Sequence, residues 1–156
     1  MQSRTVTVMY QSHLHLAGER SVEPMIALAR CSKLKRIIVA GSKSVELMFD
    51  LEARGYVHVA ATANCRRPAA QYDVALIDWR GRALKNLETA LDWLVDYLCR
   101  EGVLVVWADH QEPDAHESLR SALKSHGFVI ENGTVHEGSS GVSARRRDVK
   151  PIPEAA

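Results

Sequence analysis

The sequence predicts one α/β domain with a doubly wound, mostly parallel sheet that ends in an antiparallel β-hairpin. Short β-rich runs alternate with helical patterns at least four times between residues 36 and 131, as expected of a parallel sheet with helices on both faces. After Phe128 there is no room for another helix, and two extended stretches flank Gly138-Ser139-Ser140-Gly141. Right-handed crossovers and a closing hairpin therefore predict a three-layer architecture.

The composition is that of an ordinary globular protein. The chain has 156 residues, 46% of them hydrophobic and 25% charged, with a formal net charge of +1. This balance argues against a dedicated nucleic-acid binder or a membrane-surface protein. The basic run Arg145-Arg146-Arg147 with Lys150 is interpreted as a solvated strand end, with a phosphate-binding patch as the alternative.

The cysteines and the N-terminus indicate a cytoplasmic protein. Cys31, Cys65 and Cys99 are odd in number and widely spaced, which suits a reducing compartment and neither a disulfide framework nor a zinc site. The N-terminus lacks a signal-peptide pattern, and no apolar run is long enough to cross a bilayer.

The first elements are an arm and a helix. Arg4 to Tyr10 alternates threonine and valine, so residues 1–20 are predicted to form an edge strand or an extended arm. Ser21 to Arg30 is predicted to be a helix with Pro24 in its first turn.

The next unit is strand, helix, strand. Ile37 to Ala40 is a β-rich run typical of a strand buried on both faces. Gly41 to Ser44 turns into a helix that Gly55 ends, and Tyr56 to Ala61 is the second strand. The residues expected to cover the sheet from this helix are Val45, Met48, Phe49 and Leu51.

A long helix follows the third strand, Asp73 to Asp78. Its apolar stripe is Leu84, Leu87, Leu91, Leu94 and Leu98. Gly102 is expected to close this helix before the next strand, Val103 to Trp107.

The last helix, His116 to His126, stops at Gly127 and leads into a strand from Phe128 to Glu131. Asn132-Gly133 competes with Gly138 to Gly141 as the hairpin turn. The domain is predicted to span residues 1–150, with 151–156 as a flexible tail.

Four segments carry a resemblance to a known family. They are Ile37-Ile38-Val39-Ala40-Gly41, Tyr72 to Asp78, Glu101 to Val106, and Gly127-Phe128. They resemble the first strand with its glycine turn, the fourth strand with its terminal acid, and the openings of the fifth and sixth strands of the class I S-adenosylmethionine-dependent methyltransferases. The resemblance covers about residues 21–149 and implies a Rossmann-like fold with S-adenosylmethionine as the candidate cofactor.

The chain departs from that family at the cofactor site. The turn Gly41-Ser42-Lys43-Ser44 has a single glycine, and Ala60 to Asn64 contains no carboxylate for the ribose. Hydrogen bonds to a charged group are worth about 1.5–3 kcal/mol each, so losing two weakens binding by at least about a hundredfold unless Thr62 or Asn64 compensates. Only one helix and one strand lie between Gly41 and Asp78, so one strand–helix unit of the family, near the adenine, is expected to be missing.

Ligands of open α/β sheets bind beyond the carboxyl ends of the strands. The predicted cofactor-binding residues there are Gly41, Ser42, Lys43, Ser44, Thr62, Asn64, Asp78 and Trp79. The predicted catalytic residues are Asp78, Asp109 and His110, the last two as an acid–base pair.

Each of these residues also has a structural interpretation. Lys43 is interpreted either as an anion-binding residue or as a solvated turn residue. Asp78 either binds an amine of the substrate or cofactor or caps the segment that follows it. Trp79 stacks on a base or is a buried anchor, and Asp109-His110 is an acid–base pair or two loop neighbours. His13, His15, His110 and His116 lack the carboxylate or cysteine that would complete a metal site, so none is predicted.

Three functions are compatible with these patterns. The favoured one is a non-catalytic, methyltransferase-like module for assembly or regulation, working as a homo-oligomer or with a protein partner. The alternative is a divergent S-adenosylmethionine-dependent methyltransferase acting on a small molecule or protein. A receiver-like domain, with Asp78 as the phosphorylated residue, is disfavoured because no acidic pair follows Val39.

Overall fold

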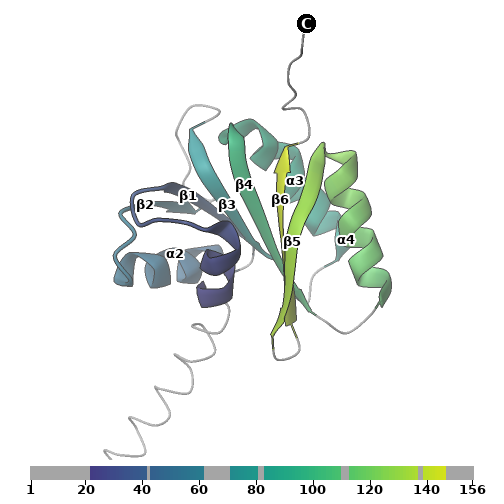
Figure 1. The fold of residues 1–156 in the computed structure, drawn as a ribbon, viewed down its shortest axis with the longest axis horizontal. Helices are drawn as coiled ribbons and strands as arrows, with labels where there is room; N and C mark the ends of the chain where they lie inside the picture. The colour runs from purple at the N-terminus through teal and green to yellow at the C-terminus, as the bar shows by residue number, and fades with distance from the viewer. Residues whose placement is uncertain are drawn as a thin grey trace, which may run out of the picture.

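A six-stranded sheet lies at the centre of the molecule (Figure 1), with the strand order β2-β1-β3-β4-β6-β5. The computed structural model describes residues 22–41, 43–61, 71–80, 83–109, 113–136 and 139–146. The strands are β1 (Arg36–Gly41), β2 (His58–Ala61), β3 (Tyr72–Asp78), β4 (Leu98–Asp109), β5 (Phe128–His136) and β6 (Ser139–Arg146). β1 to β4 are parallel, whereas β6 pairs antiparallel with both β4 and β5, which confirms the predicted fold class. The predicted strand at Arg4 to Tyr10 lies outside the described residues.

Helices cover both faces of the sheet (Figure 1). A helix over residues 22–29 and α2 (Ser44–Ala53) pack on one face, where their Met25 and Leu51 join Ile37 and Val39 of β1 in one core. α3 (Leu84–Tyr97) and α4 (Pro113–Ser125) pack on the other face, and their buried residues join Ile38 of β1 in a second core. β1 serves both cores because successive side chains of a strand point to opposite faces.

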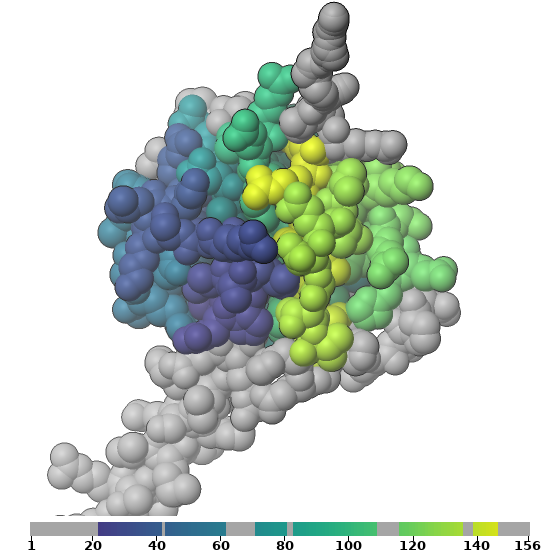
Figure 2. Space-filling model, in the orientation of Figure 1, coloured from purple at the N-terminus to yellow at the C-terminus, as the bar shows by residue number. Residues whose placement is uncertain are grey.

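The first helix also reaches the hairpin. A Cβ added to Gly141 of β6 would collide with the ring of Trp107 in β4, and the Leu28 side chain would lie 3.0 Å away. Figure 2 shows this helix at the surface beside β5. No described helix is long and apolar enough to cross a membrane.

The sheet edge at β2 agrees with the missing strand–helix unit. β2 ends at Ala61 and β3 begins at Tyr72, on the other side of β1. Among the described residues, β2 is therefore the edge strand on that side of the sheet.

The prediction for the covering face of α2 was partly wrong. Val45 and Phe49 are 41% and 60% exposed, whereas Leu47 is buried together with Leu51. The helix begins at Ser44, and its buried positions are 44, 47 and 51. That spacing of three and four defines the inward stripe and turns Val45 and Phe49 to solvent.

Gly102 does not close α3, because the helix already ends at Tyr97. β4 starts at Leu98, opposite Tyr72 of β3, and the register shifts before Val103 pairs with Val74. Gly102 therefore lies in an irregular part of β4, where an added Cβ would lie 2.5 Å from the Leu98 side chain.

The closing hairpin connects His136 of β5 to Ser139 of β6, near the predicted turn, but Ser139, Ser140 and Gly141 of that predicted turn lie in β6. The competing Asn132-Gly133 signal lies inside β5, where these residues pair with Ser143 and Val142. β5 is consequently longer than predicted.

Candidate functional site

The carboxyl ends of β1 and β3 meet at Gly41 and Asp78, which are paired in the sheet. Gly41 has φ +115, a conformation that L side chains rarely adopt. A Cβ at Gly41 would lie 2.5 Å from the backbone oxygen of Asp78. Glycine is therefore required here both by the backbone conformation and by the close approach of the two strands.

A hollow of about 260 Å³ opens at these strand ends and runs along one side of α3. It is lined by Ala40, Gly41, Ile77, Asp78, Trp79, Asn86, Leu87, Thr89, Ala90 and Trp93. The hollow lies on the side of the sheet that carries α3, because Ala40 and Ile77 belong to the core under that helix.

Trp79 borders this hollow but does not fill it. The residue is 7% exposed and packs into the core beneath α3 and α4. Its indole Nε1 donates a hydrogen bond to the carbonyl oxygen of Ala83 at 3.0 Å. Its backbone N–H donates to the carbonyl oxygen of Trp107 at 2.8 Å. The structure thus supports the buried-anchor interpretation of Trp79.

The carboxylate of Asp78 is bound by Arg80. The guanidinium donates through Nε to Oδ1 at 3.0 Å and through a terminal nitrogen to Oδ2 at 2.8 Å. Asp78 is 9% exposed, and the Arg80 side chain is about one-third exposed. Two-pronged, charge-assisted pairs of this kind are among the stronger hydrogen bonds of proteins. A ligand amine that approaches Asp78 must therefore share its carboxylate with Arg80.

The remaining predicted residues divide into those the structure places and those it does not. Lys43 precedes α2 and is exposed, whereas Ser44 is buried as the first residue of that helix. The backbone of Asp109 ends β4 opposite Ser139. Ser42, Thr62, Asn64 and His110, and the side chain of Asp109, lie outside the described part of the chain, so the acid–base pair stays a prediction.

The α3 side of the hollow was missed by the sequence reasoning. Asn86, Ala90 and Trp93 follow one another at spacings of four and three, so they share one face of the helix. This face borders the leucine stripe that was recognised. Trp93 also makes an edge-to-face contact with Tyr97, with ring centroids 5.4 Å apart and an interplanar angle of 83°.

The shifted titratable groups lie away from this hollow. Burial opposes ionisation of Asp73, but hydrogen bonds from the Arg36 side chain and backbone lower the pKa of its carboxyl overall. Burial raises the pKa of the Cys31 thiol to about 11, so this thiol stays protonated at neutral pH. Among the described residues no group of three or more His, Cys, Asp or Glu side chains could hold a metal ion.

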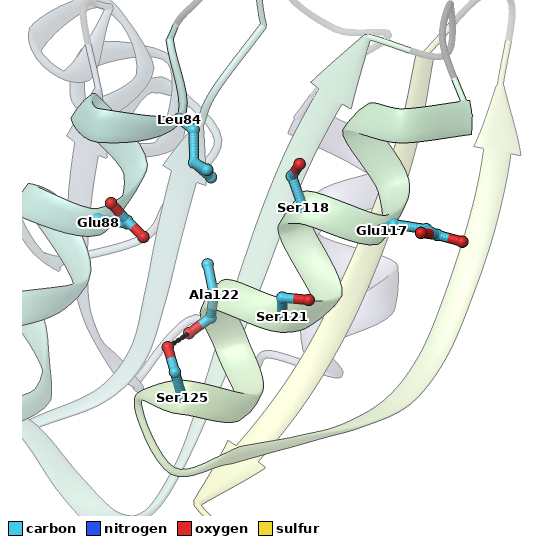
Figure 3. Close-up of a pocket in the computed structure, with 7 residues that line it drawn as sticks. All are labelled: Leu84, Glu88, Glu117, Ser118, Ser121, Ala122 and Ser125. Carbon is cyan, nitrogen blue, oxygen red and sulfur yellow. Dashed lines mark hydrogen bonds between the residues drawn. The ribbon is translucent and has the colours of Figure 1, made fainter.

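A second, larger hollow of about 510 Å³ lies between α3 and α4 (Figure 3). Its lining is Leu84, Glu88, Glu117, Ser118, Ser121, Ala122 and Ser125. The Ser125 hydroxyl is already engaged, donating to the carbonyl oxygen of Ala122 at 2.9 Å (Figure 3). None of the described residues that line this groove belongs to a strand end, so it is not the crevice predicted by the topology.

Comparison with known proteins identifies the fold. No protein-family model matches the chain, and no curated protein sequence matches it significantly. Among solved structures, Burkholderia thailandensis 1,6-didemethyltoxoflavin-N1-methyltransferase, with S-adenosylhomocysteine bound, matches with a TM-score of 0.60 at 14% identity, over 94% of this chain and 87% of that one.

Two further structures show how widely this fold is used. A chain in the complex between the Haloferax volcanii Trm112 methyltransferase activator and a putative methyltransferase matches with a TM-score of 0.62 at 7% identity, over 88% of this chain and 93% of that one. The [4+2]-cyclase SpnF matches with a TM-score of 0.59 at 12% identity, over 81% of this chain and 80% of that one. The chain therefore has the class I methyltransferase-like fold, and at these identities the likeness concerns the fold alone.

Proposed function

We propose that this chain is a divergent methyltransferase that binds S-adenosylmethionine, and its demethylated product, in the hollow above Gly41 and Asp78. The observation that carries the proposal is that this hollow is open, since the Trp79 ring is held in the core beside it. The sequence favoured a non-catalytic module because the cofactor motif is eroded; an open hollow at the strand ends favours the alternative.

The residues present fit the methionine end of the cofactor. Gly41 lines the hollow where β1 ends, and Asp78 beside it supplies a carboxylate for an ammonium group. The cofactor would bring an activated methyl group on a sulfonium. β2 ends at Ala61 without a carboxylate for the ribose among the described residues, which supports weak binding. Asp109 and His110 remain the proposed pair for removing a substrate proton.

Calorimetric titration with S-adenosylhomocysteine tests this proposal. We expect binding weaker than about 10 μM, because two charge-assisted hydrogen bonds at the ribose are lost. Ala90→Leu places extra carbon atoms in the hollow and should abolish binding. Ala53→Leu makes the same change on the exposed face of α2, across the sheet, and should leave it intact. Absence of heat at millimolar ligand overturns the proposal.

The second candidate is a non-catalytic module with a protein partner or a second copy of itself. The Asp78–Arg80 pair favours it, because Arg80 occupies the carboxylate that a cofactor amine would use. Light scattering and affinity capture distinguish the two functions. A monomer that binds the ligand and captures no partner rejects the module.

A further inference from the structure

We propose that one face of α3 holds a planar nitrogen heterocycle, the adenine of the cofactor, with Trp93 as the stacking surface and Asn86 as the hydrogen-bonding group. The inference rests on the proposed function, because it places the base in the same hollow. It assigns to α3 a task that the eroded segment after β2 is too short to perform.

The first support is the placement of the three residues. Asn86, Ala90 and Trp93 all line the hollow, and they span about 10 Å along α3 at 1.5 Å per residue. Helical side chains incline toward the N-terminus, so the Trp93 ring leans over the turn that contains Ala90. Alanine at that turn leaves room for a flat ring between Trp93 and Asn86.

The second support is that Trp93 is held in place before a ligand arrives. It is partly buried against the core, and its contact with Tyr97 fixes the ring edge to face. A fixed aromatic ring that borders an open hollow loses little conformational freedom when a base stacks on it. Removing such a platform weakens the binding of a base by about 10- to 100-fold.

The third support is the chemistry of the lining. Asp78 is the one charged residue among the described residues that line the hollow, and Arg80 neutralises it. The α3 side offers the exposed Asn86 amide, whose oxygen and NH₂ match the amino group and N7 of adenine. Thr89 uses its hydroxyl to bond the Lys85 carbonyl oxygen at 2.9 Å. An uncharged wall with one amide suits a neutral heterocycle and not a phosphate.

The test measures binding of S-adenosylhomocysteine, adenosine, inosine and methionine to the wild-type chain, Trp93→Ala, Trp93→Phe and Asn86→Ala. We expect Trp93→Ala to weaken the first two ligands about 10- to 100-fold, Trp93→Phe to weaken them less, and neither to change methionine binding. Asn86→Ala should erase the preference for adenosine over inosine, which lacks the amino group. Thermal unfolding identifies any variant that fails to fold. If Trp93→Ala does not fold, the proposal is tested with Trp93→Phe and Asn86→Ala.

The outcomes separate this inference from the proposed function. If S-adenosylhomocysteine and adenosine each bind equally to wild type and to all three variants, the α3 site is wrong and the proposed function stands. If adenosine binding depends on Trp93 but S-adenosylhomocysteine binding does not, the face holds a heterocyclic substrate and the cofactor assignment is wrong. If neither ligand binds the wild-type chain, both ideas are overturned.

Discussion

Gly41→Ala tests the geometry on which the site depends. At φ +115 an alanine is strained by about 1–2 kcal/mol, the usual cost of a left-handed conformation. Its Cβ would also lie 2.5 Å from the backbone oxygen of Asp78, which cannot rotate away as a side chain could. Forcing the two strand ends apart adds on the order of 2 kcal/mol, in the range of overpacked cores. The total is about 3–4 kcal/mol.

Gly127→Ala is the matched control. Gly127 has φ +85, and nothing lies within 4 Å of its added Cβ, so this variant measures the backbone strain alone. In a domain of this size 1 kcal/mol shifts Tm by about 2–4 °C, so Gly41→Ala should melt about 4–8 °C below Gly127→Ala. Differential scanning calorimetry on both variants gives the comparison. Equal melting temperatures would refute the close approach of β1 and β3 at the site.

The remaining predictions concern the core, the anchor and one histidine. Leu91→Ala should cost about 2–5 kcal/mol in urea unfolding because Leu91 is fully buried, whereas Phe49→Ala, at 60% exposure, should change stability by less than about 0.5 kcal/mol. Trp79→Phe should lose about 1 kcal/mol with the Ala83 hydrogen bond and keep ligand binding; lost binding would mean that the indole is part of the site. Burial opposes charging of His126, but hydrogen bonds to the Ala122 carbonyl and to Asp92, with Glu88 nearby, raise its pKa overall. The stability that comes from a raised folded-state pKa is fully present below the unfolded-state pKa and is lost as pH rises through the folded-state pKa. Asp92→Asn should therefore cost less than about 1 kcal/mol at pH 6 and nothing at pH 9 in thermal melts. A difference between variant and wild type that stays constant with pH would contradict the ion pair.

Local signals predicted the fold where they agreed with tertiary packing. The continuous apolar run of β1 and the positive-φ glycines after α2 and α4, Gly55 and Gly127, were correctly interpreted. Gly102 was misread because the pairing of Leu98 with Tyr72 starts β4 before the glycine is reached. The face of α2 was misread because Val45 and Leu47 are both apolar, and only packing against the sheet selects between them.

The sequence predicted the part of the candidate site at the strand ends but missed the part on α3. A topological rule places Gly41 and Asp78 at the strand ends, because it depends on chain order alone. No such rule places Trp93, since its distance from β1 depends on how α3 sits on the sheet. In the sequence Trp93 is one more apolar residue beside a leucine stripe, and the stripe explains the helix without it.

We propose that the erosion of the cofactor motif and the shape of the hollow have a common origin in the short connection between β2 and β3. A chain with the further strand–helix unit would extend the sheet beyond β2, where this sheet ends. Without that unit, the face of α3 that carries Ala90 and Trp93 borders open space above the end of β1. The same shortening that removes the family's segment near the adenine therefore leaves an aromatic surface free to replace it. On this argument the three losses in the motif do not add up to the loss of the site. In our proposal the base moves from a loop beyond β2 to a helix next to β3, and the Trp93 variants test this placement.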